Sequence, residues 1–271
     1  MSVSPQINIK TKTQSPAQTQ SPARTQSQAQ TQIKTETEAH AQAVAADGSR
    51  SSARASSFEV YPKLIRNIWA VGRNYALHAK ELGNPTPAID DEPIIFLKAG
   101  SSAVPSTELG GTGFSLPGFT DDIHHEAEIA LEFGQGLNFC AIGLALDLTA
   151  RMVQSLLKEK QLPWTLAKSF AAACPLSELL PIPRDFELDD VRFEFQVNGE
   201  IRQKGHTRDM IFSAERLRQY LIARYPIVPG DLLLTGTPSG VGPIRKGDCL
   251  TGQILTSRGE TFLKTAWQVL P

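Results

Sequence analysis

The segment Asp121-Asp122-Ile123-His124-His125-Glu126-Ala127-Glu128-Ile129-Ala130-Leu131 governs how the rest of the chain is interpreted. Apolar side chains recur at every second position from Ile129 onward, which predicts a β-strand whose side chains alternate between two faces. Glu126 and Glu128 therefore share a face. Two neighbouring carboxylates repel each other unless a cation or a proton lies between them. The pair indicates either a solvated edge strand or a site that holds a positive charge.

Asp147 is the candidate for a third acid beside this pair. The apolar run over residues 142–146 predicts a second strand that ends at Asp147. Thr149 is placed to cap a helix that continues to about Lys160, because apolar residues recur there at helical spacing. This strand and helix would direct Asp147 toward the region above the sheet.

A short helix is predicted over residues 75–82, with Asn74 as its N-cap and Gly83 after its end. His78 and Glu81 are three residues apart and thus neighbours on this helix. A carboxylate beside an imidazole orients the ring and raises its basicity, as a general base requires. The alternative is an ordinary surface pair, which is common and weak.

Two lysines and a glycine-rich loop are further candidates for anion binding. Lys98 ends an apolar strand over residues 94–98, and Lys168 lies in a segment marked by proline and tryptophan. Each lysine either extends to water or holds an anion; a Schiff-base role would require a depressed pKa. The loop over residues 235–242 has three glycines and two threonines, which suit close approach to a small anion.

Short strands dominate the folded part of the chain. Asn198-Gly199 between two alternating runs is a strong hairpin signal, and Ser213 is placed to cap a helix to Arg224. Few helices separate the strands, which argues against a doubly wound fold. The predicted class is α+β and mostly β, a compact mixed sheet or β-roll with a few short helices.

Composition limits the possible partners and compartments. The chain has 271 residues, a formal net charge of -1 and three widely spaced cysteines. The near-neutral charge gives no reason to expect nucleic acid, and no apolar run approaches the roughly 20 residues of a membrane-spanning helix. The cysteine pattern suits reduced thiols in an intracellular protein. We therefore expect no nucleic-acid partner and no membrane partner, and a cytoplasmic location.

The first part of the chain differs in kind. Residues 1–57 are rich in Ser, Thr, Gln, Ala and Pro, with a near repeat at residues 15–20 and 21–26. Such a composition buries too little apolar surface to offset the entropy of ordering, so we predict a disordered tail and a catalytic domain over residues 58–271. An acid-poor, Ser-rich start is also compatible with a transit peptide, which would make the location mitochondrial.

Several motifs in order, from about Leu64 to the end, resemble the fumarylacetoacetate hydrolase family. The closest subgroup is that of the acylpyruvate hydrolases and the oxaloacetate decarboxylases or tautomerases. The motifs are Gly72-Arg73-Asn74-Tyr75, Phe96-Leu97-Lys98, His125-Glu126-Ala127-Glu128, Leu146-Asp147-Leu148-Thr149-Ala150-Arg151, Trp164-Thr165-Leu166-Ala167-Lys168-Ser169-Phe170, Asn198-Gly199-Glu200, Gly230-Asp231 and Thr235-Gly236-Thr237-Pro238. The resemblance implies a mixed β-sandwich roll, a homodimer, and an Mg²⁺ or Mn²⁺ ion.

The same resemblance implies roles for particular residues. The metal ligands would be Glu126, Glu128 and Asp147, whose oxygen atoms suit a hard cation. A 2-oxo acid would chelate the ion, which would stabilise the enolate formed when a C–C bond breaks. The catalytic residues would be His78, Glu81 and Lys168. The substrate-binding residues would be Lys98, Arg151, Gln154 and Thr237.

Three hypotheses about function follow. The first is a divalent-metal-dependent hydrolase that cleaves C–C bonds of acylpyruvates, with possible oxaloacetate decarboxylase or tautomerase activity. The second is a catalytically impaired, homodimeric 2-oxo acid and metal-binding protein, because the segment between the two acidic strands, Gly134 to Gly143, is short and would displace Asp147. The third, a zinc hydrolase using His124, His125 and Glu126, conflicts with the geometry of a strand, on which adjacent residues face opposite ways.

Overall fold

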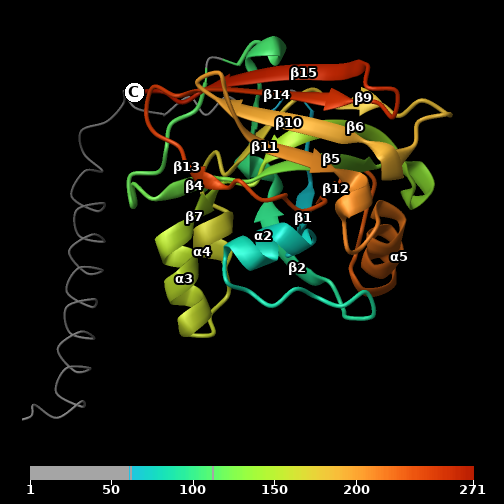
Figure 1. The fold of residues 1–271 in the computed structure, drawn as a ribbon, viewed down its shortest axis with the longest axis horizontal. Helices are drawn as coiled ribbons and strands as arrows, with labels where there is room; N and C mark the ends of the chain where they lie inside the picture. Colours follow the sequence, from blue (N-terminus) through green and yellow to red (C-terminus); the bar gives the residue numbers. More distant parts are fainter. Residues whose placement is uncertain (1–60, 62, 112) are drawn as a thin grey trace, which may run out of the picture. The chain divides into compact units, whose positions relative to one another are not determined.

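The computed structural model describes residues 61, 63–111 and 113–271. Residues 58–271 form one compact unit, and Figure 1 shows the arrangement of its strands and helices. The prediction of a disordered tail over residues 1–57 lies outside the described residues. Within the described part of the chain, no helix is long and apolar enough to cross a membrane.

The larger sheet has eight strands and mixes parallel with antiparallel pairing. Strands β1 and β12 pair in parallel, as do β3 and β8, whereas β5 pairs antiparallel with both of its neighbours. In spatial order the strands are β2 (Ile94–Ala99), β1 (Asn67–Gly72), β12 (Leu232–Leu234), β5 (Ala127–Phe133), β6 (Phe139–Leu146), β8 (Cys174–Leu176) and β3 (Ala103–Pro105), with β9 (Leu180–Pro181) paired to β6. The two acidic segments of the sequence therefore enter the site from adjacent central strands.

Two smaller sheets complete the β structure. The four-stranded sheet has the order β11 (Glu200–His206), β10 (Arg192–Val197), β14 (Cys249–Leu255) and β15 (Thr261–Gln268). The three-stranded sheet has the order β13 (Gly242–Pro243), β4 (Ile123–His125) and β7 (Thr149–Ala150). The turn between β10 and β11 confirms the predicted hairpin: Asn198 and Gly199 both have positive φ, at 53° and 79°, as a type I′ turn requires.

The four-stranded sheet packs over β5 and β6 (Figure 1). Apolar side chains on one face of β5, such as Ile129 and Leu131, join the same core as Phe193, Phe195 and Trp267 of the smaller sheet. The layers approach so closely that a Cβ at Gly252 of β14 would lie 2.3 Å from the Leu144 side chain of β6. This mixed, mostly β roll confirms the predicted fold class.

Among the residues that the structure describes, four short helices lie beside the sheets. They are α2 (Ala76–Glu81), α3 (Arg151–Glu159), α4 (Thr165–Lys168) and α5 (Ala214–Arg224). Single 3-10 turns lie at Gly100–Ser102, Thr107–Leu109, Gln135–Leu137, Leu188–Asp190 and Thr207–Asp209. Ser213 caps α5 as predicted, because its hydroxyl accepts a hydrogen bond from the Arg216 amide at 3.3 Å.

The other two predicted caps are wrong. The N-cap of α2 is Tyr75, while the Asn74 side chain donates to the carbonyls of Phe212 and Thr235 and accepts from the Phe212 amide. Thr149 lies in β7, and its hydroxyl donates to the Asp147 carbonyl at 3.0 Å. At the start of α3 the Met152 amide instead donates to the Asp122 carboxylate at 2.9 Å. Both side chains therefore make their hydrogen bonds away from the helix ends.

Candidate active site

Three carboxylates converge where β5 and β6 meet. Glu126 lies at the break between β4 and β5, Glu128 is the second residue of β5, and Asp147 directly follows β6. The register pairs Ala127 with Leu146, and the Asp147 amide donates to the Glu126 carbonyl at 2.8 Å. One oxygen from each acid lies within 4.8 Å of the others. All three are buried in the middle of the sheet, so a solvated edge strand is excluded.

The short segment between the two strands does not displace Asp147. The β5–β6 pairing runs from Ala127 opposite Leu146 to Phe133 opposite Phe139, and a single turn of 3-10 helix over Gln135–Leu137 closes it. The pairing register places Asp147 beside Glu126 regardless of what the connection contains. The premise of the impaired-site hypothesis is therefore wrong.

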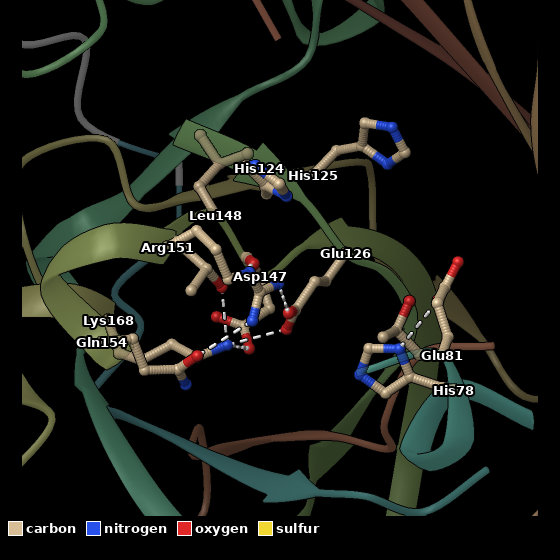
Figure 2. A network of polar contacts seen from close by, with 12 residues as sticks. His78, Glu81, His124, His125, Glu126, Asp147, Leu148, Arg151, Gln154 and Lys168 are labelled. Carbon is tan, nitrogen blue, oxygen red and sulfur yellow. Dashed lines mark hydrogen bonds and ion pairs between the residues drawn. The ribbon is translucent and has the colours of Figure 1, made fainter. Parts of the chain in front are cut away.

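Cationic side chains surround the acids (Figure 2). Lys168, at the end of α4, donates to Glu126 Oε2 at 2.7 Å, to Asp147 Oδ2 at 2.5 Å and to Thr149 Oγ1 at 2.7 Å. Arg151, the first residue of α3, donates to Glu126 and, at 2.9 Å, to Gln154 Oε1. These contacts use all three protons of the Lys168 ammonium, which leaves it as a fixed positive charge.

Lys98 contacts Asp147 but does not line the cavity. Its side chain is fully buried, and its ammonium donates to Asp147 Oδ1 at 2.7 Å and to the carbonyls of Leu148 and Lys168. Asp147 lines the cavity and Lys98 does not, so Lys98 borders the site only through its contact with Asp147. Any effect of Lys98 on a substrate would act through the orientation and charge of Asp147.

The environments of Glu126 and Glu128 shift their pKa values in opposite directions. Burial opposes the ionisation of Glu126, but Lys168, Arg151 and His78 outweigh it and hold its pKa well below the ordinary value. Burial, reinforced by the charges of Asp147 and Glu126, raises the pKa of Glu128 well above the ordinary value. The Glu128 carboxylate accepts one hydrogen bond, from the Gly236 amide at 2.6 Å. It is the acid that a further cation would relieve most.

The donor set fits a hard divalent cation. Every candidate ligand atom is a carboxylate oxygen, as Mg²⁺ and Mn²⁺ prefer. Glu126, Glu128 and Asp147 would hold the ion, and the ion would cancel the repulsion that raises the pKa of Glu128.

His78 and Glu81 form the predicted pair on α2. His78 Nδ1 lies 3.4 Å from Glu81 Oε2, and the imidazole lies across the cavity from Glu126 (Figure 2). The other Glu81 oxygen accepts from the Gly240 amide at 2.9 Å, which ties α2 to the glycine-rich loop. Burial lowers the pKa of His78, against the opposing effect of Glu126 and Glu81, so the ring is neutral near pH 7. A neutral imidazole held by a carboxylate is competent to accept a proton.

The glycine-rich loop uses its donors within the protein. The Gly236 amide binds Glu128, and the Thr237 hydroxyl donates to the Ala127 carbonyl at 2.9 Å. Gln203 of β11, which the sequence analysis missed, donates to Thr237 Oγ1 at 2.7 Å and accepts from the Ala127 amide at 2.9 Å. The anion for which the loop is suited is thus a carboxylate of the site itself.

A small cavity opens at the acids. It is lined by every predicted site residue except Glu81 and Lys98. Among the other lining residues are Arg73, Lys158 and Trp164, which the sequence analysis did not assign to the site. Arg73 follows β1 directly, and Lys158 lies in the last turn of α3, where a lysine ordinarily complements the helix dipole.

His124 and His125 do not act together as ligands. His124 Nε2 lies 3.0 Å from Asp122 Oδ1, whereas His125 Nδ1 lies 3.0 Å from Gln203 Oε1. The two rings diverge from the strand (Figure 2), as the alternation of side chains predicts. This geometry argues against the zinc hypothesis.

Comparisons with known proteins were consistent with this architecture. Residues 67–265 match the family model described as Fumarylacetoacetate (FAA) hydrolase C-terminal. A relative from Dictyostelium discoideum, "Oxaloacetate decarboxylase, mitochondrial", is 43% identical over 196 residues, covering 68% of this chain and 87% of the relative. "Oxaloacetate tautomerase FAHD1, mitochondrial" from Arabidopsis thaliana is 44% identical over 197 residues, covering 69% of this chain and 85% of the relative.

Solved structures share the fold. The fumarylpyruvate hydrolase of Pseudomonas aeruginosa in complex with Mn²⁺ and pyruvate has a TM-score of 0.67 at 26% identity, covering 81% of this chain and 99% of that one. The 5-carboxymethyl-2-hydroxymuconate delta-isomerase of Mycobacterium smegmatis has a TM-score of 0.63 at 29% identity, covering 78% and 81%. The family match and the relatives together show that this chain belongs to the fumarylacetoacetate hydrolase family of enzymes.

Proposed function

We propose that this protein is a divalent-metal-dependent enzyme that acts on oxaloacetate and related small 2-oxo acids by moving a proton at the carbon next to the keto group. The observation that carries the proposal is the cluster of three buried carboxylates, Glu126, Glu128 and Asp147, below a cavity that His78 also lines. Relatives more than 40% identical are named oxaloacetate decarboxylase and oxaloacetate tautomerase, which supports oxaloacetate as the substrate.

Mg²⁺ or Mn²⁺, when bound by the three acids, would supply electrophilic stabilisation of the negative charge that develops on the keto oxygen. The structural neighbour from Pseudomonas aeruginosa, described as a complex with Mn²⁺ and pyruvate, supports this choice of ion and of ligand class.

The side chains of the cavity supply the remaining functions. Arg151, oriented by Gln154, faces the cavity as a fixed cation that can bind the substrate carboxylate. Lys168 remains an ammonium, because its three protons are committed, and contributes positive charge rather than a base. His78, held by Glu81, takes the proton from the substrate carbon when the enol forms and gives a proton to that carbon in the reverse direction, while the enolate oxygen takes up its proton from water or releases it to water.

Hydrolysis of acylpyruvates is a second reaction that the same residues can perform. In that reaction His78 would take the proton from a water molecule that attacks the acyl carbonyl. The C–C bond to the pyruvate unit would then break, which releases the acyl part as a carboxylic acid and the pyruvate unit as an enolate that receives the proton from His78 at its carbon. The likeness to a fumarylpyruvate hydrolase, at 26% identity, favours this second candidate.

Removal of the metal tests the proposal. The full chain should interconvert the keto and enol forms of oxaloacetate in the presence of Mg²⁺, lose this activity in EDTA and regain it with Mg²⁺ or Mn²⁺. His78→Ala should lower kcat by about 10²-fold or more, as removal of a general base does, and should bind Mn²⁺ like the parent protein in a calorimetric titration. Turnover that persists after complete metal removal would overturn the proposal. Loss of the metal in His78→Ala would instead make His78 a ligand.

Two further predictions belong with this proposal. The homodimer stays a prediction, to be tested by light scattering. The relatives carry the word mitochondrial in their names, which favours the mitochondrial alternative over the cytoplasmic location. Fractionation of cells that express the full chain distinguishes the two locations.

A further inference from the structure

The start of helix α3 depends on a residue from another part of the chain. An α-helix leaves its first amide groups without partners inside the helix, and an N-cap side chain ordinarily accepts hydrogen bonds from them. The N-cap of α3 is Ala150, which has no side-chain acceptor, and the first turn holds no acidic residue. Asp122 takes both of the first amides instead. Its carbonyl accepts from the Arg151 amide and its carboxylate accepts from the Met152 amide, each at 2.9 Å.

The pairing of β4 with β7 explains how Asp122 reaches this helix end. Asp122 directly precedes β4, and Arg151 directly follows β7. The two strands are antiparallel, with Ile123 opposite Ala150. One step further in the same register, Asp122 lies opposite Arg151, so the sheet itself carries the acid to the start of α3.

The Asp122 carboxylate is held at both of its oxygens. Oδ2 accepts from the Met152 amide, and Oδ1 lies 3.0 Å from His124 Nε2. Because a carboxylate can only accept, the His124 ring carries its proton on Nε2 and donates it to Asp122. His124 thus fixes the direction in which the second oxygen faces the helix.

The charge of Asp122 is placed where α3 requires it. Arg151 is the first residue of α3, so its positive charge lies at the positive end of the helix dipole, which is unfavourable. An acid at the same end offsets this cost. Gln154, one turn later, accepts from the Arg151 guanidinium at 2.9 Å, and both side chains line the cavity. The point at which α3 begins therefore determines where both side chains lie in the site.

We propose that Asp122, held by His124, is a positioning residue that sets the start of α3 and thereby aims Arg151 at the substrate carboxylate. This inference rests on the proposed function, in which Arg151 binds that carboxylate. Neither Asp122 nor His124 lines the cavity, so both act on the substrate through Arg151. Their role is the alignment of a cation and not contact with the substrate.

Asp122→Ala removes the carboxylate and leaves the backbone carbonyl that accepts from Arg151. We expect KM for oxaloacetate, and the dissociation constant of oxalate from the Mn²⁺-loaded protein, to rise about tenfold, as for a helix that loses its cap. kcat should change by less than about threefold, because a contact made equally in the ground and transition states contributes mainly to KM. Asp122→Asn keeps an oxygen for the Met152 amide and should bind oxalate within about threefold of the parent. Steady-state kinetics and calorimetric titration measure these values.

A double-mutant cycle with Arg151 separates positioning from a general structural effect. In an Arg151→Ala background, Asp122→Ala should change oxalate binding by less than about twofold, because the side chain that it aligns is gone. An undiminished loss in that background would overturn the inference, as would parent-like oxalate binding by Asp122→Ala itself. His124→Phe keeps a flat ring without the donor and should show the same dependence on Arg151 at smaller size. It keeps the cycle available if Asp122→Ala does not fold.

Asp121→Ala is the matched control, because Asp121 is the neighbouring acid, is exposed and does not line the cavity. It should bind oxalate like the parent, and a loss equal to that of Asp122→Ala would overturn the inference by assigning the effect to surface charge. Oxalate titration requires no turnover. A cycle that gives the expected result in a parent protein that does not turn over oxaloacetate would support the positioning role and contradict the proposed function alone.

Discussion

The structure buries two kinds of carboxylate, which differ in what surrounds them. One is Asp231, which is surrounded by hydrogen-bond donors, and the other is the acid cluster of Glu126, Glu128 and Asp147, whose members lie close to one another. Asp231 has no exposed surface and accepts four hydrogen bonds from neutral donors: the Asn67 amide, the Asn67 side chain, the Trp69 indole and the Val228 amide. Glu128 lies beside two other acids and accepts one. A carboxylate saturated by donors holds the chain together, whereas acids crowded against each other hold a place for a cation.

Glu128→Gln should have the largest effect on kcat/KM, and it is the most direct test of the difference between the two kinds of buried acid. The amide keeps the shape of the side chain and can still accept from the Gly236 amide, but it removes one ligand charge. We expect kcat/KM to fall about 10³-fold, because a bound metal contributes several kcal/mol to catalysis, and Mn²⁺ to bind more weakly. The free energy of unfolding without metal should stay the same or rise, since repulsion with Asp147 and Glu126 disappears. Urea denaturation and Mn²⁺ titration measure the two effects.

A destabilised Glu128→Gln protein that keeps its activity would contradict the distinction between the two kinds of acid. It would make Glu128 a structural residue like Asp231.

Asp231→Ala should have the complementary result. Four buried donors would lose their acceptor, and unsatisfied buried groups cost about 1–3 kcal/mol each. We expect the free energy of unfolding to fall by about 3 kcal/mol or more, while the folded fraction keeps kcat/KM within about twofold. Urea denaturation monitored by circular dichroism measures the free energy of unfolding, and kinetics on the folded fraction measure kcat/KM. Unchanged stability with lost metal binding would place Asp231 in the site.

Glu81→Gln should have the smallest effect on kcat/KM of the three substitutions. It tests a third kind of carboxylate, one that is partly exposed and acts on the pKa of His78. Glu81 raises the pKa of His78, against burial, which lowers it. Removal of the charge should therefore lower this pKa further, so the acidic limb of kcat/KM should move to lower pH. Lys80→Gln, at an exposed position on the same helix, is the control. A limb that moves to higher pH would show that His78 does not set it.

The sequence predicted those parts of the fold and site that local pattern controls. Alternation placed Glu126 and Glu128 on one face, and the Asn198-Gly199 turn and the Ser213 cap lie where short-range signals put them. These features depend on residues within a few positions of each other, so a single chain suffices to identify them.

Features that depend on distant segments were missed or misassigned. Asn74 and Thr149 have the right chemistry for caps, but the Phe212 carbonyl and the Lys168 ammonium engage them instead. Gln203 gave no local signal, since its four hydrogen bonds all reach residues more than 30 positions away. Lys158 looked like an ordinary helix-terminal lysine, because only the folded chain brings it to the cavity.

Gln203 also has a consequence for protein engineering. It belongs to β11 of the four-stranded sheet, yet its amide group binds Ala127, which lies between Glu126 and Glu128, and Thr237 of the glycine-rich loop. The outer layer is thus part of the scaffold that aligns the acids. A chimaera that grafts a foreign outer layer onto the eight-stranded sheet would need to supply an equivalent amide at this point, or the transplanted centre would lose its alignment.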